Sequence, residues 1–406
     1  MMQKSGKVVV VSQHYPPDHS TTAAIMAAIA NRVASQAEVL VLSGMPGSAS
    51  TASAGKPAVV EIRNWMPGKA VLIKRAAAEV LFTVRIFAAL LTKLQRGDVA
   101  LTVTAPFMLP YAVAAAARLK RAKSALIMHD LYPDVLIMAG LLKPTSLVAK
   151  AVRGLNALMF RALNAVIIIG RDTEKLLLQY GGMRPDKIRF IPNWATLVPA
   201  VRPVHADNPF RRPLAARFVV GLSGNLGFTH DPVIVFEAAR LLRDDPDIHF
   251  LLSGWGIGID RLREMQSEAN LPNVTLVDRV EDDELETFLS AADVWLIPYR
   301  KSVAGVSVPS RFYNLLAVGR PVVLVSEPEA EAALIVSENN LGWVVAPGMP
   351  DQLAAAIRAA CSSTDSSMPE RVVAAARGFS SERALTSYAS LIQGLLQKPE
   401  QAGQAS

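Results

Sequence analysis

Arg311 lies where a cationic side chain is unfavourable unless an anion binds beside it. In the segment VPSRFYNLLAVGRPVV (308–323), Pro309 marks a helix start and Gly319 its end, which predicts Arg311 in the first helical turn. A cation there opposes the helix dipole. An anion held by backbone N–H groups and the guanidinium together would remove that cost. The segment therefore predicts an anion site, and a solvated arginine is the alternative.

A second candidate for phosphate binding is the segment SGNLGFTHDP (223–232), which follows the apolar run RFVVGL. Gly224 and Gly227 would let the backbone approach a diphosphate closely. Asp231 and Pro232 are typical of the cap and first turn of the next helix. Two glycines between a strand and a helix are common, so this segment alone is a weak indication.

His129 and Asp130 end a buried apolar run and open the segment HDLYPD (129–134). Functional groups in open α/β sheets gather at the carboxyl ends of the strands. Two interpretations remain open from position alone. Either both side chains act in a site, or Asp130 caps the helix that Pro133 begins and His129 is a satisfied loop residue.

The segment GWGIG (254–258) follows another apolar run, and Asp278 comes about twenty residues later, as in a dinucleotide-binding fingerprint. Its spacing is G-x-G-x-G rather than G-x-G-x-x-G. An NAD(P)-dependent oxidoreductase or epimerase is therefore an alternative function. There is no hydrolytic carboxylate pair, no G-x-S-x-G segment and no cluster with metal-ligand spacing, so we expect no metal site and no cofactor. The single cysteine, Cys361, excludes an intrachain disulfide and a cysteine zinc cluster.

These segments need a scaffold that brings them together. The 406 residues are 51% hydrophobic and 19% charged, which is typical of a globular chain with two domains. Continuous apolar runs alternate with helical stretches, and the same order restarts after the polar segment HADNPFRRP (205–213). This pattern predicts an α/β fold of two doubly wound, Rossmann-like domains with a site in the cleft between them. We expect domains at 1–204 and 205–379 and a loose tail at 398–406.

The charges are distributed unevenly along the chain. Residues 1–200 contain 24 Lys and Arg against 10 Asp and Glu, whereas residues 201–406 contain 18 against 25. The first half therefore favours contact with an anionic surface. The basic residues are not interleaved with aromatic ones, so we expect a membrane or a phosphorylated acceptor and not a nucleic acid. The apolar runs are too short for a secretory signal or a span, which predicts a cytoplasmic protein. Residues 61–96 are the expected contact with the inner membrane face.

Several segments together resemble the family 4 glycosyltransferases, in particular bacterial enzymes of the colanic-acid type that build exopolysaccharide and O-antigen units. The segments that carry the resemblance are VVSQHYPPD, HDLYPD, KIRFIPNW, GLSGNLG, ELETFLSAADVWLIPYR and VPSRFYNLLAVGRPVV. The ending FSSERALTSYASLIQGLL is similar to the C-terminal helix of the family, which crosses back to the first domain. We expect this helix at 380–397.

The resemblance implies a GT-B fold, with the acceptor in the first domain and a nucleotide diphosphate sugar in the second. It implies retaining transfer without a metal, by front-face displacement in which the leaving diphosphate helps to deprotonate the acceptor. It favours a UDP-sugar over a GDP-sugar, and a lipid-linked saccharide or polysaccharide as acceptor. The implied catalytic residues are His129, Asp130 and Arg311. The implied donor contacts are Gly224, Asn225, Gly227, Ser310, Arg311 and Asn314, with Gly254, Arg279 and Val280 near the base and ribose.

The chain departs from the common family pattern at several of these places. Val306 and Asn314 stand where the family has a Glu-x7-Glu pair, and Asn225 and His230 stand where it has an arginine and a lysine. Arg311 is then the main remaining cation for the diphosphate. Asn193, in the family's I-P-N turn, is expected to be structural. Because of the missing glutamates, a catalytically inactive binding protein of glycan assembly is a further alternative.

Overall fold

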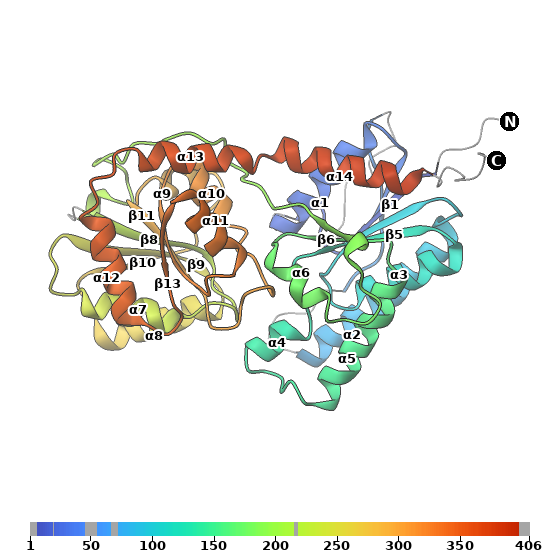
Figure 1. Ribbon diagram of the computed structural model, residues 1–406, viewed down its shortest axis with the longest axis horizontal. Coiled ribbons are helices and arrows are strands. Elements are labelled where there is room, and N and C mark those ends of the chain that lie inside the picture. The colour runs from blue at the N-terminus through green and yellow to red at the C-terminus, as the bar shows by residue number, and fades with distance from the viewer. Residues whose placement is uncertain (1–5, 19, 45–54, 66–71, 215–217, 398–406) are drawn as a thin grey trace, which may run out of the picture.

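The computed structural model of the protein contains two parallel β-sheets, each covered by helices on both faces (Figure 1). The structure describes residues 6–18, 20–44, 55–65, 72–214 and 218–397. The predicted loose tail at 398–406 lies outside the described residues. In the part of the chain that the structure describes, no helix has both the length and the apolar character that crossing a membrane requires.

The N-terminal sheet has the strand order β3-β2-β1-β4-β5-β6-β7, and all neighbouring strands are parallel. Its central strands are buried on both faces, which explains why they are continuous apolar runs and do not alternate with polar residues. The strands are β1 (Val8–Ser12), β2 (Val39–Ser43), β3 (Ala58–Glu61), β4 (Val99–Val103), β5 (Lys123–Met128), β6 (Ala165–Ile168) and β7 (Ile188–Phe190).

The helices of the N-terminal domain form two layers. Val8 and Val10 of β1 pack towards α1 (Thr21–Ala34), whereas Val9 and Val11 pack towards the opposite layer, because successive side chains of a strand point to opposite faces. That opposite layer consists of α2 (Leu72–Lys93), α3 (Leu109–Lys120) and α5 (Leu147–Ala162). Shorter elements are α4 (Asp134–Met138), α6 (Asp172–Leu177) and the 3-10 turn η1 (Pro185–Lys187).

The C-terminal sheet has the strand order β10-β9-β8-β11-β12-β13 and is also parallel throughout. Its strands are β8 (Phe218–Asn225), β9 (Ile248–Trp255), β10 (Val274–Val277), β11 (Val294–Pro298), β12 (Val322–Val325) and β13 (Gly342–Val345). The elements around it are η2 (Arg212–Leu214), α7 (Pro232–Leu241), α8 (Ile257–Ala269), α9 (Leu285–Leu289), α10 (Phe312–Ala317), α11 (Glu331–Asn339), α12 (Pro350–Cys361) and α13 (Met368–Gly378). The prediction of two doubly wound α/β domains is confirmed.

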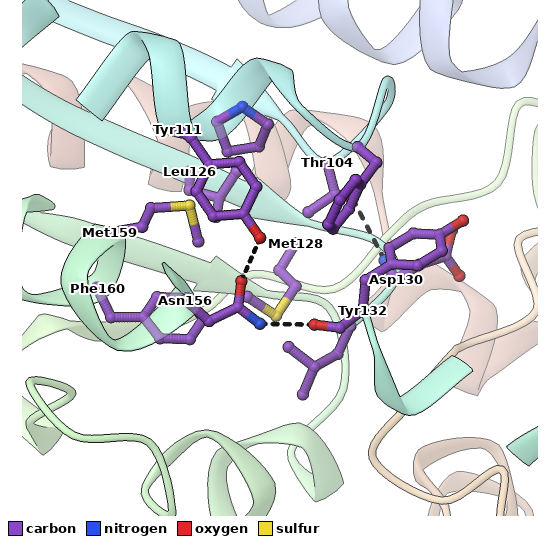
Figure 2. Close-up of a pocket in the computed structure, with 12 residues that line it drawn as sticks. Thr104, Tyr111, Leu126, Met128, Asp130, Tyr132, Asn156, Met159 and Phe160 are labelled. Atoms are coloured by element: carbon purple, nitrogen blue, oxygen red, sulfur yellow. Dashed lines mark hydrogen bonds between the residues drawn. The ribbon is translucent and has the colours of Figure 1, made fainter. Parts of the chain in front are cut away.

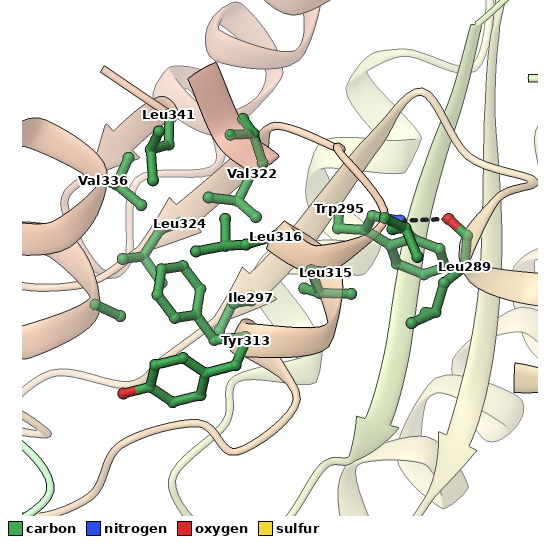
Figure 3. Packing of buried hydrophobic residues seen from close by; sticks show 14 of the residues in the cluster. Leu289, Trp295, Ile297, Tyr313, Leu315, Leu316, Val322, Leu324, Val336 and Leu341 are labelled. Atoms are coloured by element: carbon green, nitrogen blue, oxygen red, sulfur yellow. Dashed lines mark hydrogen bonds between the residues drawn. The ribbon is translucent and has the colours of Figure 1, made fainter. Parts of the chain in front are cut away.

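Figure 3 shows one core of the C-terminal domain, in which Trp295 of β11 is fully buried. The indole Nε1 of Trp295 donates a hydrogen bond to the carbonyl oxygen of Leu289 at 3.1 Å, so the ring is held in place. The ring lies against Gly221 of β8, where an added Cβ would come within 2.5 Å of the ring carbon Cζ3. Gly221 therefore provides the space that the indole occupies.

Residues 380–397, where a helix was expected to cross back, contain α14 (Ser381–Leu396), which packs against α1 (Figure 1). Tyr388 of α14 is buried, and its ring meets Trp194 edge-on with centroids 6.4 Å apart. Arg32 of α1 forms an ion pair with Glu382 at 3.0 Å. α14 thus completes the helical layer of the first domain on the side of α1.

Replacing Gly221 by Ala should lower the free energy of unfolding by about 1–3 kcal/mol, because the added methyl group overpacks against a ring that cannot move away. Gly394→Ala in α14 is the matched control, since a Cβ there meets nothing within 4 Å. We expect it to be neutral or to stabilise the protein by up to about 1 kcal/mol. Urea denaturation of both variants measures the difference, and equal stabilities would contradict this account of the core.

Candidate active site in the cleft between the sheets

A cleft with about 1490 Å³ of empty space, part of it open to solvent, lies between the two domains. Both sheets have the strand order in which ligands bind beyond the carboxyl ends of the central strands, where the direction of winding reverses. The cleft lies at these ends. Its lining includes residues after β5, β6, β8 and β11 and from the start of α1: Thr21, Thr22, His129, Asp130, Ile169, Asn225, Gly227, Phe228, Pro298, Tyr299, Ser310 and Arg311.

Arg311 borders the cleft as the N-cap residue of α10, and not in the first helical turn as the sequence predicted. The difference arises because Pro309 precedes the helix by three residues. With only six residues, α10 has a small dipole, so the guanidinium itself is the main source of positive potential. Burial lowers the pKa of Arg311, Asp282 raises it and Arg279 lowers it further. Among the described carboxylates, none forms an ion pair with Arg311, so its charge remains available to a ligand.

The loop after β8 lies directly beside this arginine. Gly224 has a φ of +117°, and a Cβ at this position would lie 3.6 Å from Nε of Arg311. Asn225 and Gly227 line the cleft, whereas Gly224 supports the arginine from behind. Asp231 caps α7 as its spacing predicts, because its Oδ1 accepts a hydrogen bond from Val233 N at 3.0 Å. The loop and Arg311 together form one polar wall of the cleft.

His129 and Asp130 form part of the opposite wall. The Thr104 hydroxyl accepts hydrogen bonds from the backbone N–H groups of His129 and Asp130 at 3.2 and 3.4 Å, which positions both residues. Burial raises the pKa of Asp130, and a hydrogen bond with Ser307 from the other domain partly offsets this. Asp130 does not cap α4, whose N-cap is Pro133 with no side-chain hydrogen bond. The capping interpretation is therefore wrong.

The His129 ring is neutral in the folded protein. Burial lowers the pKa of His129 to about 4. Its Nε2 atom is buried and has no hydrogen-bond partner among the described residues, and the residue lines the cleft. A buried nitrogen without a partner is costly, so a ligand hydroxyl beside it would gain a hydrogen bond that the free protein lacks.

Asn193 lines the cleft, although from the sequence it was expected to be structural. It follows β7 within the I-P-N turn and is 5% exposed. Its Oδ1 atom is buried and has no partner among the described residues. Thr21 and Thr22 also reach the cleft from the first turn of α1. The signal for Asn193 was a polar side chain shortly after the edge strand β7, and that for Thr21 and Thr22 was a helix start.

Besides Gly224, four of the predicted contacts do not line the cleft. Asn314 does not face it because its Oδ1 accepts hydrogen bonds from the backbone N–H and hydroxyl of Thr196 at 2.8 and 3.2 Å. Asn314 thus binds the interdomain connection, which is a correction of the predicted donor contact. The other three lie outside the lining. Gly254 packs on Gly224, and Val280 packs against a hydrophobic cluster of the C-terminal domain. The Cζ atom of Arg279 lies 4.6 Å from the centroid of the Trp255 ring.

The glycines at 254–258 have a structural explanation. Gly256 begins α8 with a φ of +96°, and a Cβ there would come within 2.5 Å of Oδ1 of Asn225. The Asp278 side chain is fully exposed and lies 3.4 Å from Arg263. It is not part of the cleft lining. Among the described residues there is also no group of three His, Cys, Asp or Glu side chains that could hold a metal ion.

A network of charged groups joins the domains at one end of the cleft. Oδ2 of Asp172 accepts hydrogen bonds from the backbone N–H groups of Gly305 and Glu331 at 2.8 and 3.0 Å. Arg171 forms ion pairs with Glu331 and Glu338, both at 3.0 Å. Glu331 is 1% exposed, so the pair with Arg171 offsets the cost of burying its charge. We call these five residues the interdomain clasp.

Figure 2 shows a narrow pocket of about 290 Å³ of empty space within the first domain. Its walls come from the ends of β4 and β5 and from α3 and α5, and Asp130 is part of its lining. The Tyr111 hydroxyl donates to Oδ1 of Asn156 at 2.7 Å, and Nδ2 of Asn156 donates to the Tyr132 carbonyl at 2.6 Å. Because Asp130 and Tyr132 line both this pocket and the cleft, the two spaces adjoin.

His129 should make the stability of the protein depend on pH. In the unfolded chain the imidazole is protonated below about pH 6.5, whereas the folded protein keeps it neutral to about pH 4. Stability is therefore lost as the pH falls through this window. Replacing His129 by Asn should reduce the loss of unfolding free energy between about pH 7.5 and about pH 5 by on the order of 1–2 kcal/mol.

Urea titrations at both pH values test this expectation. His230 is the matched second site, because burial, and the nearby Arg300 charge, lower its pKa to about 4 as well. His230→Asn should act in the same direction, and His205→Asn, whose residue lies on the surface, should not. A pH dependence that is unchanged in His129→Asn would contradict the burial of this ring.

Comparison with known proteins assigns both domains. Residues 9–194 match the glycosyl transferase 4-like domain, and residues 217–363 match the glycosyl transferases group 1 domain. The chain is 27% identical over 330 residues to WbjE of Pseudomonas aeruginosa, named as a probable glycosyltransferase; the match covers 80% of this chain and 82% of WbjE. It is 30% identical over 184 residues to WcaI of Escherichia coli (strain K12), provisionally named as a colanic acid biosynthesis glycosyl transferase. That match covers 44% and 45% of the two chains.

Solved glycosyltransferase structures have the same fold. Sucrose-phosphate synthase from Thermosynechococcus elongatus superposes with a TM-score of 0.72 at 16% identity, over 96% of this chain and 99% of that one. Anabaena HepE in complex with UDP gives a TM-score of 0.68 at 15% identity, over 96% and 100%. With the GT-B architecture confirmed and both of its domains matched in order, the chain belongs to the group 1 glycosyl transferases with a 4-like N-terminal domain, and it is a glycosyltransferase.

Proposed function

We propose that the protein is a retaining glycosyltransferase of bacterial surface polysaccharide biosynthesis. It moves a sugar from a UDP-sugar to a lipid-linked saccharide or a polysaccharide. The observation that carries this proposal is the half-buried guanidinium of Arg311, which borders the cleft beside Gly224 and pairs with no described carboxylate. Anabaena HepE, which has the same fold, has been solved in complex with UDP, with UDP and glucose, and with UDP-glucose, which supports a UDP-sugar as donor.

In this proposal the donor diphosphate lies between Arg311, Ser310 and the loop 225–227. Backbone N–H groups and a guanidinium are the groups that bind phosphate oxygens most strongly. The transferred sugar then extends towards His129 and Asn193, whose buried Nε2 and Oδ1 atoms have no partner among the described residues. Hydroxyl groups of the sugar would supply those partners. Asp130 lies at the junction with the narrow pocket, on the acceptor side.

The proposed reaction is a front-face displacement. The bond between the anomeric carbon and the diphosphate oxygen breaks, and the acceptor oxygen forms its bond to the same face of the sugar. The acceptor proton passes to the leaving diphosphate. Arg311 stabilises the negative charge that develops on the diphosphate, so catalysis depends on positioning and on electrostatic stabilisation. Because a guanidinium supplies this positive charge, we propose that no metal is required.

We propose a cytoplasmic location with peripheral attachment to the membrane, where a lipid-linked acceptor is presented.

The two alternative functions have less support. The glycines of the fingerprint at 254–258 pack against the loop after β8, and Asp278 faces solvent away from the cleft, which speaks against a dinucleotide site. A catalytically inactive binding protein is distinguished by its failure to transfer or hydrolyse the donor.

Replacing Arg311 by Ala should weaken UDP binding and slow turnover by at least about tenfold, because a charge-assisted bidentate contact contributes roughly 1.5–3 kcal/mol. Lysine should rescue only in part, since it lacks the planar fork. Thermal shift with UDP and with GDP measures binding and also tests the preferred base. Arg261→Ala is the matched control, because Arg261 lies on the surface of the same domain with Glu264 as its partner. Wild-type kinetics in Arg311→Ala would overturn the assignment.

Two results are expected if the reaction retains the anomeric configuration and needs no metal. Proton NMR of the first product should show the anomeric configuration of the donor, and chelation by EDTA should leave the rate unchanged. Adding back Mg²⁺ or Mn²⁺ after chelation is the control. An inverted product would exclude front-face displacement. A rate that falls with EDTA and returns with the metal would exclude the proposal that Arg311 supplies the positive charge in place of a metal ion.

A further inference from the structure

Helix α5 has an apolar stripe on its outer face that no described element covers. Leu147, Val148, Leu155 and Leu158 are 83%, 60%, 50% and 62% exposed. Val148, Leu155 and Leu158 follow Leu147 by one, eight and eleven residues, which places all four on one side of the helix, together with exposed Ala151. Met159 and Phe160, on the inner side, are buried in the core. The helix is therefore apolar towards the core and also towards the outside.

The neighbouring helices continue this surface. α3 packs on both α2 and α5, so the three helices form one layer over the N-terminal sheet. Exposed apolar side chains on the other two helices are Val80, Leu81 and Val84 of α2 and Leu119 of α3. Phe82, Ile86 and Leu90 of α2 are fully buried, so they are core residues and do not belong to the surface expected within 61–96. We call the outer side of α2, α3 and α5 the basic helical face.

The name reflects the charge of these helices. Together α2, α3 and α5 contain nine Lys and Arg residues and a single acidic residue, Glu79. Lys150 and Arg161 border the apolar stripe of α5, are exposed, and form no ion pair with a described carboxylate. On the opposite side of the sheet, α1 and α14 contain two arginines and one glutamate. This layer of helices thus has the larger excess of positive charge, although one of the nine, Arg153, pairs with Asp134 at 2.7 Å.

We propose that the basic helical face docks on an anionic lipid leaflet, with the stripe of α5 inserted among the lipids. Apolar side chains flanked by lysine and arginine are the combination that binds such interfaces: the apolar groups enter the headgroup region and the cations attract anionic lipid. An exposed apolar stripe has no favourable contact in water, and an anionic polymer would match only the charges. The lipid surface satisfies both properties.

The basic helical face is the specific membrane contact of the proposed glycosyltransferase, and this proposal rests on the proposed function. The inner side of α5 contributes Asn156, Met159 and Phe160 to the narrow pocket that adjoins the cleft (Figure 2). One helix therefore separates the proposed lipid surface from the acceptor side of the site. Docking through this face would bring a lipid-linked acceptor to within one helix of Asp130.

Co-sedimentation of the full chain with vesicles tests the proposal. The vesicles consist of phosphatidylcholine alone or of equal parts of phosphatidylcholine and phosphatidylglycerol, at about 0.05 M and about 0.5 M salt. We expect binding to the anionic vesicles at low salt and release at high salt. Leu155→Ser with Leu158→Ser, and separately Lys150→Glu with Arg161→Glu, should each lower the vesicle partition coefficient by about tenfold or more.

The matched controls lie on the C-terminal domain. Leu241→Ser with Met349→Ser removes apolar side chains that are 38% and 48% exposed there, and should leave vesicle binding unchanged. UDP binding, measured in all variants, should equal that of the wild type, which shows that they are folded. It also separates the two proposals, because a wild type that binds vesicles but not UDP contradicts the donor site alone.

Four results would overturn the docking surface. The first is that the wild-type protein does not bind anionic vesicles at low salt, and the second is that the α5 variants bind as well as the wild type. The third is that the wild type does not bind vesicles but associates with itself, and that the α5 variants lose this self-association. The fourth is binding to duplex DNA in place of vesicles. The third would identify the face as a contact between copies of the chain. The fourth would identify it as a nucleic-acid surface.

Discussion

The interdomain clasp is the contact on which the cleft depends. A carboxylate that is buried between two domains is unfavourable unless donors from both sides reach it. Asp172 meets this condition in part: the backbone N–H groups of Gly305 and Glu331 donate to its Oδ2 from the other domain, whereas its buried Oδ1 has no partner among the described residues. Gly170 makes the approach possible, since a Cβ there would overlap Asp172, Val308 and Glu331. The relative position of the two walls of the cleft is therefore determined by hydrogen bonds that have little tolerance in length.

Within this frame the two walls have complementary polarity. The C-terminal wall presents a cation, Arg311, whose desolvation is tolerated in the free protein without an ion pair to any described carboxylate. The N-terminal wall presents a neutral imidazole and an amide, each with one buried atom that lacks a partner among the described residues. A charged diphosphate suits the first wall and a hydroxylated sugar the second. A nucleotide sugar contains both groups in one molecule, with the bond to be broken between them.

The helices of the N-terminal domain have unequal environments although they pack on the same sheet. α1 is covered on its outer side by α14, so its sequence carries little charge and few exposed apolar groups. α2, α3 and α5 have no such cover among the described elements, yet they retain apolar side chains on the outside. Inside, α5 lines the pocket beside Asp130, and its Asn156 donates a hydrogen bond to the Tyr132 carbonyl.

The sequence by itself determined the two doubly wound domains, because strands buried on both faces must be continuous apolar runs and the helices between them have 3.6-residue periodicity. It also indicated His129, Asp130, Asn225, Gly227 and Arg311, since each directly follows a strand or begins a helix, where open α/β sheets place their sites. The tertiary structure decided which of these positions face the cleft. Asn314 lies one turn after Arg311, yet its amide is bound by Thr196, a contact across 118 positions that no local pattern contains. Asn193 faces the cleft because of how the chain turns after β7. Exposure likewise depends on neighbours distant in the chain: Phe82 and Val84 are both apolar residues of α2, and only the packing of α3 and the sheet makes one of them core and the other surface.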